Sequence, residues 1–430
     1  MIEKTISKRF QATIDLSNIL KDTGNINLNR DSAFHKSLLG IALRRLGEIE
    51  LSLKKYIKKP IKKNKSIVRA NIIIGATQIL FMKTPSYAAV NDAVKIAKIL
   101  APNYANFTNA ILRKLNKDKD NKNIMDMDPI FNIPILLKKR WVQFLTKEQL
   151  KNIALQHLII PPALDIAFKE TRDIEKYETL LNGIKLGTKN IRILKPKGKI
   201  SNFSGYKEGK WWIQDIAAQV PCKVLINSLP KNPKVIDMCA APGGKTSQLI
   251  SYGAEVTALE KNSERTIILS NNLKRLNLKA EIINIDANYW TPNELVDAVL
   301  IDAPCSATGA IRKNPDIAWR FNSSKKTLST KLKVLNKIQA KLLLSASKMI
   351  DTKGILIYSV CSLEPEEGKD IIEKFLNNNQ KFKIIPIKPT EIDIPSKVIT
   401  KEGFVQTFPF LWSEKGGMDG FFIARLAKSY

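Results

Sequence analysis

Two cysteine residues stand where a thiolate could attack a substrate. Cys305 ends the fragment Asp302-Ala303-Pro304-Cys305, and Cys361 lies within Tyr358-Ser359-Val360-Cys361-Ser362. Each follows an apolar run that reads as a strand, in a chain with four cysteines. Because thiolates are strong nucleophiles, two thiols at such positions indicate covalent catalysis rather than a structural role.

A third segment predicts a nucleotide pocket. Residues 235–238 read as a strand, and the stretch from Cys239 to Thr246, CAAPGGKT, forms a glycine turn that leads into a helix. The ending GKT also closes a Walker A loop, but that loop requires a glycine where this chain has Cys239. A GxGxxG dinucleotide fingerprint is absent as well. The pocket therefore lacks both common phosphate-binding loops.

Acidic residues end the strands that border this turn. Asp237 lies at the end of the first strand, Glu260 follows the second, and Asp286 follows the third. A carboxylate after the second strand is placed to accept the two hydroxyls of a ribose, and Asp286 could accept a hydrogen bond from an adenine amino group. The set suits S-adenosylmethionine, which carries a nucleoside but no phosphate. The alternative is that Asp237 and Glu260 only cap helices or turns.

The thiols and Asp302 together suit methyl transfer to cytosine. Carbon 5 of cytosine is a poor nucleophile, but attack of a thiolate on carbon 6 makes it enamine-like. Carbon 5 then takes the methyl group, and loss of its proton expels the thiol. Asp302, if protonated, could donate to the ring nitrogen and stabilise the developing charge. The alternative is a pair of inert buried cysteines.

Composition and periodicity divide the chain into three predicted domains. Apolar residues at helical spacing from about 5 to 115 predict an all-helical domain, and the polar stretch 116–128 reads as a linker. A small α+β unit is expected to about residue 205. Apolar strands then alternate with helices, which predicts a doubly wound, largely parallel α/β sheet. The expected strands are 235–238, 255–259, 281–285, 298–301 and 354–359, with a helix at 366–377; the predicted domains are 1–125, 126–205 and 206–430.

The strongly basic charge points to a polyanionic partner. The formal net charge is +30 with a pI near 9.8, and nucleic acid is the leading candidate because Lys and Arg displace counterions from phosphate. A biased composition, rich in Lys, Asn and Ile throughout, is the alternative. The helical domain carries Arg44, Arg45 and a lysine run between 54 and 65, which either contact RNA or form a solvated face.

The cysteine and histidine positions argue against a metal site. The cysteines form no CxxC pair, and His35 and His157 lie far from them in sequence, so zinc is not expected. No stretch is apolar enough over eighteen or so residues to span a bilayer. We therefore expect a cytoplasmic monomer with reduced thiols.

The order of these motifs resembles the NOL/NOP/Sun family of RNA cytosine-5 methyltransferases, and closely its bacterial members that act on 16S ribosomal RNA. The N-terminal part resembles a NusB-like RNA-binding domain in YANFTNAILR (104–113). The matching segments of the remainder are DMCAAPGGKT (237–246), the acids at 260 and 286, IDAPCSATGAIRKNPDI (301–317), YSVCSLEPEEG (358–368) and GGMDGFFIARL (416–426). The resemblance covers nearly the whole chain and implies a Rossmann-like class I methyltransferase domain.

The resemblance also implies residue roles. The nucleophile of the family falls on Cys361, and the cysteine that assists release of the methylated RNA falls on Cys305. DNA cytosine-5 methyltransferases instead use the Pro-Cys cysteine, so sequence chemistry alone favours Cys305, and the resemblance reverses that choice. Asp302 would sit between cofactor and base. The residues expected to hold S-adenosylmethionine are Cys239, Ala240, Ala241, Pro242, Gly243, Gly244, Lys245, Glu260, Asp286 and Asp302.

One segment departs from the family pattern, and two other functions stay open. The strand after the paired prolines usually carries arginine and asparagine, whereas this chain has Leu164-Asp165-Ile166-Ala167-Phe168, which places its RNA contacts in doubt. Transfer RNA is an alternative substrate to free or partly assembled small-subunit RNA. A non-catalytic RNA-binding or antitermination factor is the alternative from another class, and the intact cysteines and glycine turn argue against it.

Overall fold

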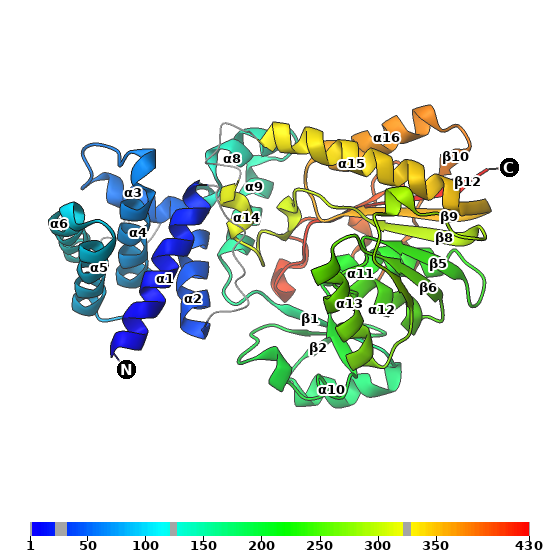
Figure 1. Cartoon of the computed structure of the whole chain (residues 1–430), viewed down its shortest axis with the longest axis horizontal. Helices are drawn as coiled ribbons and strands as arrows, with labels where there is room; N and C mark the ends of the chain where they lie inside the picture. The colour runs from blue at the N-terminus through cyan, green and yellow to red at the C-terminus, as the bar shows by residue number, and fades with distance from the viewer. Residues whose placement is uncertain (1, 22–31, 121–126, 321–327, 430) are drawn as a thin grey trace. The chain divides into compact units, whose positions relative to one another are not determined.

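The computed structural model describes residues 2–21, 32–120, 127–320 and 328–429. They form two compact units (Figure 1). The first comprises Met1–Ile160 with Ile311–Leu328, and the second comprises Pro161–Ala310 with Ser329–Tyr430. These units are defined by compactness, whereas the boundaries at 125 and 205 rest on sequence composition and stay a prediction.

The N-terminal part of the first unit is a bundle of helices, as the apolar spacing predicted. Helix α4 lies at its centre, because it is apolar on all sides and packs against α1, α2, α5 and α6. Gly75 of α4 permits this closeness, since a Cβ there would lie 2.5 Å from Leu112 of α6. The helices are α1 (Ile2–Lys21), α2 (Ala33–Arg44), α3 (Leu46–Lys54), α4 (Ser66–Phe81), α5 (Ser86–Leu100) and α6 (Ala105–Lys117).

A later segment of the chain completes the first unit. The indole of Trp319 in α14 (Asp316–Arg320) donates to the Leu43 carbonyl at 2.8 Å, and Arg44 Nη2 donates to the Arg312 carbonyl at 2.7 Å. Residues 311–320, which lie between the Cys305 motif and the next long helix in sequence, therefore fold with the bundle. The unit also contains η4 (Pro129–Asn132), α8 (Ile135–Trp141) and α9 (Lys147–Leu158).

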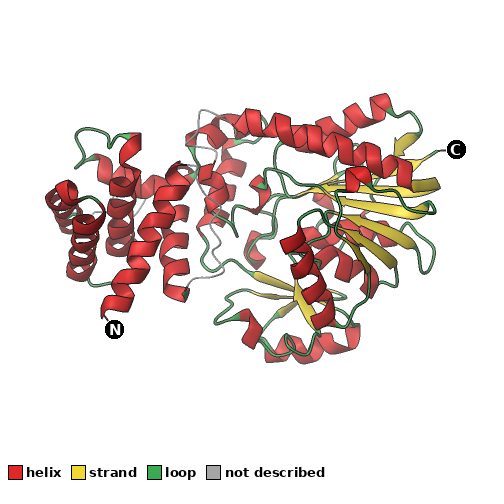
Figure 2. Cartoon of the chain, viewed as in Figure 1, coloured by secondary structure: helices red, strands yellow, loops and turns green. Residues whose placement is uncertain are grey.

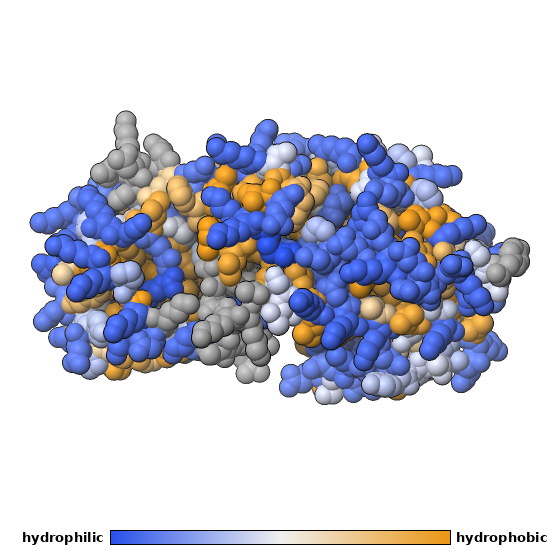
Figure 3. Space-filling view, turned by 90° about the horizontal axis from the view of Figure 1, so that it is seen from above, coloured by the Kyte–Doolittle hydropathy of each residue, from blue (hydrophilic) through white to orange (hydrophobic). Residues whose placement is uncertain are grey.

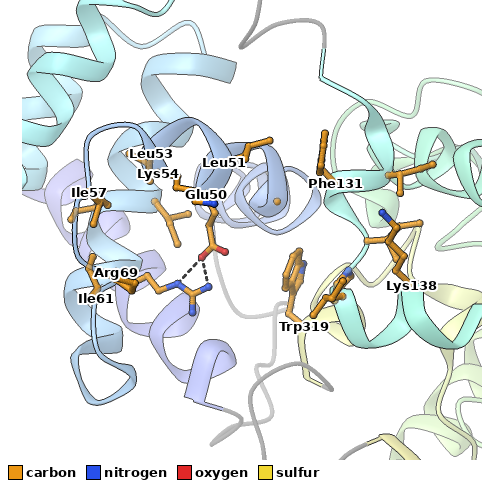
Figure 4. A pocket seen from close by; sticks show the side chains of 18 residues that line it. Glu50, Leu51, Leu53, Lys54, Ile57, Ile61, Arg69, Phe131, Lys138 and Trp319 are labelled. Atoms are coloured by element: carbon orange, nitrogen blue, oxygen red, sulfur yellow. Dashed lines mark hydrogen bonds and ion pairs between the residues drawn. The ribbon is translucent and has the colours of Figure 1, made fainter.

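A cavity of about 650 Å³ opens in this unit and contains none of the predicted site residues (Figure 4). Its lining is mainly aliphatic, with Phe131 and Trp319 adding aromatic surface. Glu50 and Arg69 form an ion pair at its wall.

The second unit begins with a small antiparallel sheet in the order β2-β3-β1-β4. Asp165 and Arg192 form a fully buried bidentate pair at 2.5 and 2.7 Å, and Asp165 also accepts the Ile216 amide. The Asp165 carboxylate is thus fully used inside the protein. The strands are β1 (Leu164–Phe168), β2 (Ile184–Gly187), β3 (Asn190–Ile193) and β4 (Trp211–Ile213), so this sheet extends past residue 205.

The main sheet has the order β10-β12-β9-β8-β5-β6-β7. Strands β9, β8, β5, β6 and β7 run parallel, while β12 lies antiparallel between β9 and β10. Figure 2 shows helices on both faces of this sheet. The strands are β5 (Lys234–Met238), β6 (Glu255–Leu259), β7 (Glu281–Ile283), β8 (Val296–Asp302), β9 (Ile350–Val360), β10 (Phe382–Ile384), β11 (Val405–Gln406) and β12 (Phe422–Lys428).

Side-chain alternation explains why the central strands read as continuous apolar runs. In β9, Ile355 and Ile357 join the core on the α11 side, whereas Leu356 and Tyr358 join the core on the α15 and α16 side. A strand covered on both faces must be apolar at every position. The covering helices are α11 (Ile216–Ile226), α12 (Gly244–Ser251), α13 (Ser263–Leu276), α15 (Leu328–Met349) and α16 (Lys369–Asn378).

The predicted strands are confirmed with shifts of a few residues at their ends. The antiparallel strand β12 was not among them, although its residues belong to the quoted 416–426 motif. Within the described residues, no helix combines the length and apolar character needed to cross a membrane. Figure 3 shows hydrophilic side chains over most of the visible face, in keeping with 70 lysines and arginines.

Candidate active site

The strand order brings the predicted site residues to one edge of the sheet. The carboxyl ends of β9, β8, β5 and β6 lie side by side and lead to Cys361, Asp302, Cys239 and Glu260 in that order. Asp286 follows β7, the next strand. Ligands of open parallel sheets bind outside these carboxyl ends. The thiols thus lie at one end of the row and the acids expected to hold a nucleoside lie at the other.

The two cysteines of the motifs face each other. The Sγ atoms of Cys305 and Cys361 lie 3.5 Å apart, and both residues are half-buried. The hydrogen bond to the Cys361 thiol and burial raise the pKa of Cys305 well above its usual value. A raised pKa disfavours the thiolate form of Cys305, and either of the two sulfurs can be the donor of the hydrogen bond between them.

The other two cysteines differ from this pair. Cys222 is fully buried in α11, its sulfur faces the Lys245 carbonyl at 3.5 Å, and burial raises its pKa well above the usual value. Burial and the nearby carboxylates of Asp302, Glu260 and Asp237 raise the pKa of Cys239 to about 12. Both thiols stay protonated, so neither competes as a nucleophile.

Asp302 lies at the end of β8 and is tied on both oxygens. Its Oδ2 pairs with the ammonium of Lys245 at 2.8 Å, and its Oδ1 accepts from the Ser359 hydroxyl at 3.3 Å. Burial would lower the pKa of Lys245, but the Asp302 carboxylate outweighs it and the net shift is upward. Lys245 is therefore a buried cation beside Asp302, a partner that the sequence pattern did not reveal.

The glycine turn has the backbone shape that its sequence suggested. Cys239 has φ +62 and Gly243 has φ +100, a left-handed conformation that glycine adopts without strain. Asp237 anchors the turn from inside, because its fully buried carboxyl accepts from the Thr246 hydroxyl at 2.6 Å. Burial raises the pKa of Asp237 to about 7. Asp237 is thus a support of the turn rather than an exposed acid.

Glu260 is a buried acid with one oxygen that lacks a hydrogen-bond donor among the described residues. It is 3% exposed, and its Oε1 accepts from the Asn262 amide at 3.0 Å. Its Oε2 is buried and accepts no hydrogen bond from the described part of the chain, with Arg265 Nη1 3.4 Å away. Buried carboxylate oxygens are rarely left without a donor, so a hydroxyl pair of a bound molecule fits here.

Asp286 lies where predicted but has a structural task as well. Its Oδ1 accepts from the amide and the side chain of Asn288, at 3.0 and 2.8 Å, and so caps the short helix η7 (Ala287–Tyr289). Among the residues with described positions, no group of three His, Cys, Asp or Glu side chains could hold a metal ion.

Known protein families match most of the chain. Residues 224–427 match the family described as 16S rRNA methyltransferase RsmB/F, and residues 3–117 match the NusB family. The ribosomal RNA small subunit methyltransferase B of Pasteurella multocida (strain Pm70) is 30% identical, over 96% of this chain and 92% of that protein. The chain belongs to the RsmB/F family of 16S rRNA methyltransferases. It is therefore an enzyme of the S-adenosylmethionine-dependent methyltransferase class, with a NusB-like helical domain.

Other relatives agree with this membership. The protein of the same name from Klebsiella pneumoniae (strain 342) is 28% identical over 96% of this chain and 94% of its own. The solved structure of PH0851 has a TM-score of 0.75 at 22% identity over 98% of each chain. NSun6 from Pyrococcus horikoshii, solved with SFG, has a TM-score of 0.56 at 18% identity over 69% of this chain and 98% of that one. These structures confirm the predicted fold.

Proposed function

We propose that the chain transfers a methyl group from S-adenosylmethionine to carbon 5 of a cytosine in 16S ribosomal RNA through a covalent cysteine–base intermediate. The observation that carries this proposal is the pair of thiols, 3.5 Å apart, at the ends of the neighbouring strands β8 and β9. Asp302, paired with Lys245, lies at the end of β8, between the thiols and the glycine turn. A binding protein would need none of these groups.

The residues around the turn fit the cofactor. Glu260 Oε2, which accepts no hydrogen bond from the described residues, would accept from the ribose hydroxyls, Asp286 would accept from the adenine amino group, and the backbone from Cys239 to Lys245 would line the cofactor. When bound, S-adenosylmethionine supplies an electrophilic methyl group. Asp302 and Glu260 follow the two strands that border β5, so they lie on either side of the glycine turn and would favour a positively charged ligand there.

The two thiols take different roles. Cys361, as the thiolate, attacks carbon 6 of the base, and the electron pair of the ring moves onto carbon 5, which accepts the methyl group. Loss of the carbon 5 proton re-forms the ring double bond and expels the Cys361 sulfur. Cys305, held as a neutral thiol, donates a hydrogen bond to that sulfur and stabilises it as it leaves.

The names of the relatives and the charge support ribosomal RNA as the substrate. The relatives are called ribosomal RNA small subunit methyltransferases, and this chain carries a formal charge of +30. A base must leave its stack to reach half-buried thiols, which costs a few kcal/mol and favours a loop of free or partly assembled small-subunit RNA. The described loop after α3 exposes Lys55, Lys58, Lys59 and Lys62, which can contact phosphates.

The test compares the two cysteines on a denaturing gel. Each variant is incubated with S-adenosylmethionine and unmethylated 16S RNA. Cys305→Ala should methylate and then stall as a nuclease-sensitive protein–RNA adduct, while Cys361→Ala should give neither methylation nor adduct. Bisulfite sequencing of the RNA identifies the modified cytosine. An adduct from Cys361→Ala alone would invert the roles, and no adduct from either variant would contradict the covalent mechanism. Modification of transfer RNA instead would contradict the substrate.

A further inference from the structure

Glu367 is a buried carboxylate next to the Cys361 loop that the proposed chemistry leaves unused. It ends the short helix η9 (Pro365–Glu367) and has no exposed surface. A carboxylate removed from water is costly unless donors surround it. Its oxygens accept from the Ser306 amide at 2.9 and 3.1 Å, from the Ser306 hydroxyl at 2.5 Å and from Gln339 Nε2 at 3.1 Å. Ser306 is the residue that follows Cys305.

The residues before and after Cys305 are both hydrogen-bonded to buried side chains. Gln339, on α15, also donates from its Nε2 to the Pro304 carbonyl at 3.0 Å, so the residues before and after Cys305 are held by one buried pair of side chains. The next residue, Ala307, has φ +58, a conformation that an alanine adopts only where its surroundings enforce it. The Cys305 loop is therefore held in shape by Glu367 and Gln339.

The same network joins the two cysteine loops. The Ser306 and Ser362 hydroxyls lie 3.0 Å apart, and Ser362 follows Cys361. The Gly309 amide donates to the Cys361 carbonyl at 3.0 Å. Gly309 cannot be larger, because a Cβ there would lie 2.0 Å from the Gly420 carbonyl oxygen. The residue that follows each cysteine, Ser306 or Ser362, is thus hydrogen-bonded to the loop of the other cysteine.

We propose that Glu367 is a positioning residue, whose buried carboxylate clamps the Cys305 loop against the Cys361 loop and so sets the facing arrangement of the two thiols. This inference rests on the proposed function. Its consequence concerns product release. In that step the carbon 6–sulfur bond breaks and its electron pair stays on the Cys361 sulfur. The pair of the carbon 5–hydrogen bond forms the ring double bond, and the proton passes to water. Without the clamp, Cys305 no longer faces the departing sulfur.

Glu367→Gln is the informative change. It keeps the side-chain volume but removes the charge, and its NH₂ group would face the Ser306 and Gln339 N–H donors, with the Ser306 hydroxyl as the one partner that can accept. The main chain stays anchored, because the Tyr358 hydroxyl donates to the Glu367 carbonyl at 2.8 Å. Charged hydrogen bonds are strong enough that we expect release to slow by about tenfold or more. Glu373→Gln, on the exposed side of α16, is the matched control.

The full chain is tested in single and multiple turnovers on unmethylated 16S RNA. Glu367→Gln should transfer the first methyl group as the wild type does, accumulate the adduct, and turn over slowly, whereas Glu373→Gln should match the wild type. A purely structural role would lower first-turnover methylation and adduct together. That result, or wild-type behaviour of Glu367→Gln, would overturn the inference.

A second variant is used if a thermal melt shows that Glu367→Gln is unfolded. Ser306→Ala removes the hydroxyl contact and keeps the amide, so it should show the same adduct at a lower level; wild-type behaviour would overturn the inference. Cys305→Ala separates the two proposals. If it accumulates adduct while the clamp variants do not, the inference alone fails. If it gives no adduct and the wild type does not methylate cytosine, the proposed function fails.

Discussion

Replacing Glu260 tests the ribose assignment. In the free protein its Oε2 is buried without a hydrogen bond from the described residues, while its Oε1 accepts from Asn262. Hydrogen bonds to a charged group contribute about 1.5–3 kcal/mol each, so Glu260→Ala should weaken binding of S-adenosylmethionine by on the order of 1–3 kcal/mol. That range corresponds to a roughly 5- to 150-fold rise in Kd. Partial replacement of the lost contact by water or by Arg265 would place the result at the low end.

Isothermal titration calorimetry with two ligands makes the assay specific. S-adenosylhomocysteine has the same ribose but lacks the sulfonium charge. A lost ribose contact should weaken both ligands equally, whereas a lost electrostatic attraction should weaken S-adenosylmethionine more. Glu264→Ala, at the exposed start of α13, removes a nearby carboxylate as the control. Unchanged affinity for both ligands in a folded Glu260→Ala protein would refute the assignment.

Three further predictions concern stability and RNA binding. Asp165→Ala should lower the free energy of unfolding by roughly 3–5 kcal/mol in urea titrations, because it leaves Arg192 buried without its partner. The raised pKa of Asp237, about 7, means that the folded chain binds a proton that the unfolded chain releases near pH 4. The ligand-free wild type should therefore lose up to about 4 kcal/mol relative to Asp237→Asn between about pH 4 and 7. Replacing Lys58 and Lys62 by Gln should flatten the salt dependence of RNA binding by about one to two units of log–log slope.

Each of these has its own control. Removing both partners, as Asp165→Ala with Arg192→Met, should recover much of the lost stability, and no recovery would argue against the pair as the cause. If the free energies of unfolding of the wild type and Asp237→Asn changed with pH in parallel, the carboxyl would be ionised in the folded chain, and the prediction would be wrong. For the lysine variant, cofactor affinity is the internal control. An unchanged salt slope would assign the two lysines to a solvated face.

The local features of this chain were readable from its sequence. Alternating side chains on a doubly covered sheet leave long apolar runs, so the central strands were predicted to within a few residues. The turn after β5 has a left-handed conformation at residue 243, and the glycine at that position adopts it without strain. The helical bundle followed from apolar spacing in the same way. Strand β12 was missed because it joins the sheet antiparallel and no α-helix separates it from the preceding short strand β11.

The arrangement of the site was decided by tertiary structure. Sequence spacing could not state that β8 and β9 are neighbours, and only that pairing brings Cys305 and Cys361 to 3.5 Å. The chemistry of Pro304-Cys305 alone favoured Cys305 as the nucleophile, whereas in the folded chain the hydrogen bond with Cys361 and burial raise the pKa of Cys305. Such effects depend on distance and on exclusion of water, which belong to the folded chain and not to the order of its residues.

The acids show the same division. Asp237 and Glu260 look alike in sequence, each at the end of a strand, and each has one buried oxygen without a hydrogen bond from the described residues. They differ in their surroundings, because Asp237 is fully buried and accepts from the Thr246 hydroxyl inside the turn, whereas Glu260 accepts from the Asn262 amide and lies beside Arg265. The segment YSVCSLEPEEG does not reveal that Glu367 is buried, because a carboxylate in a polar run usually faces solvent. Its hydrogen-bond partners, Ser306 and Gln339, are distant in sequence. Only the folded chain brings them together around Glu367, which is therefore buried between the two cysteine loops.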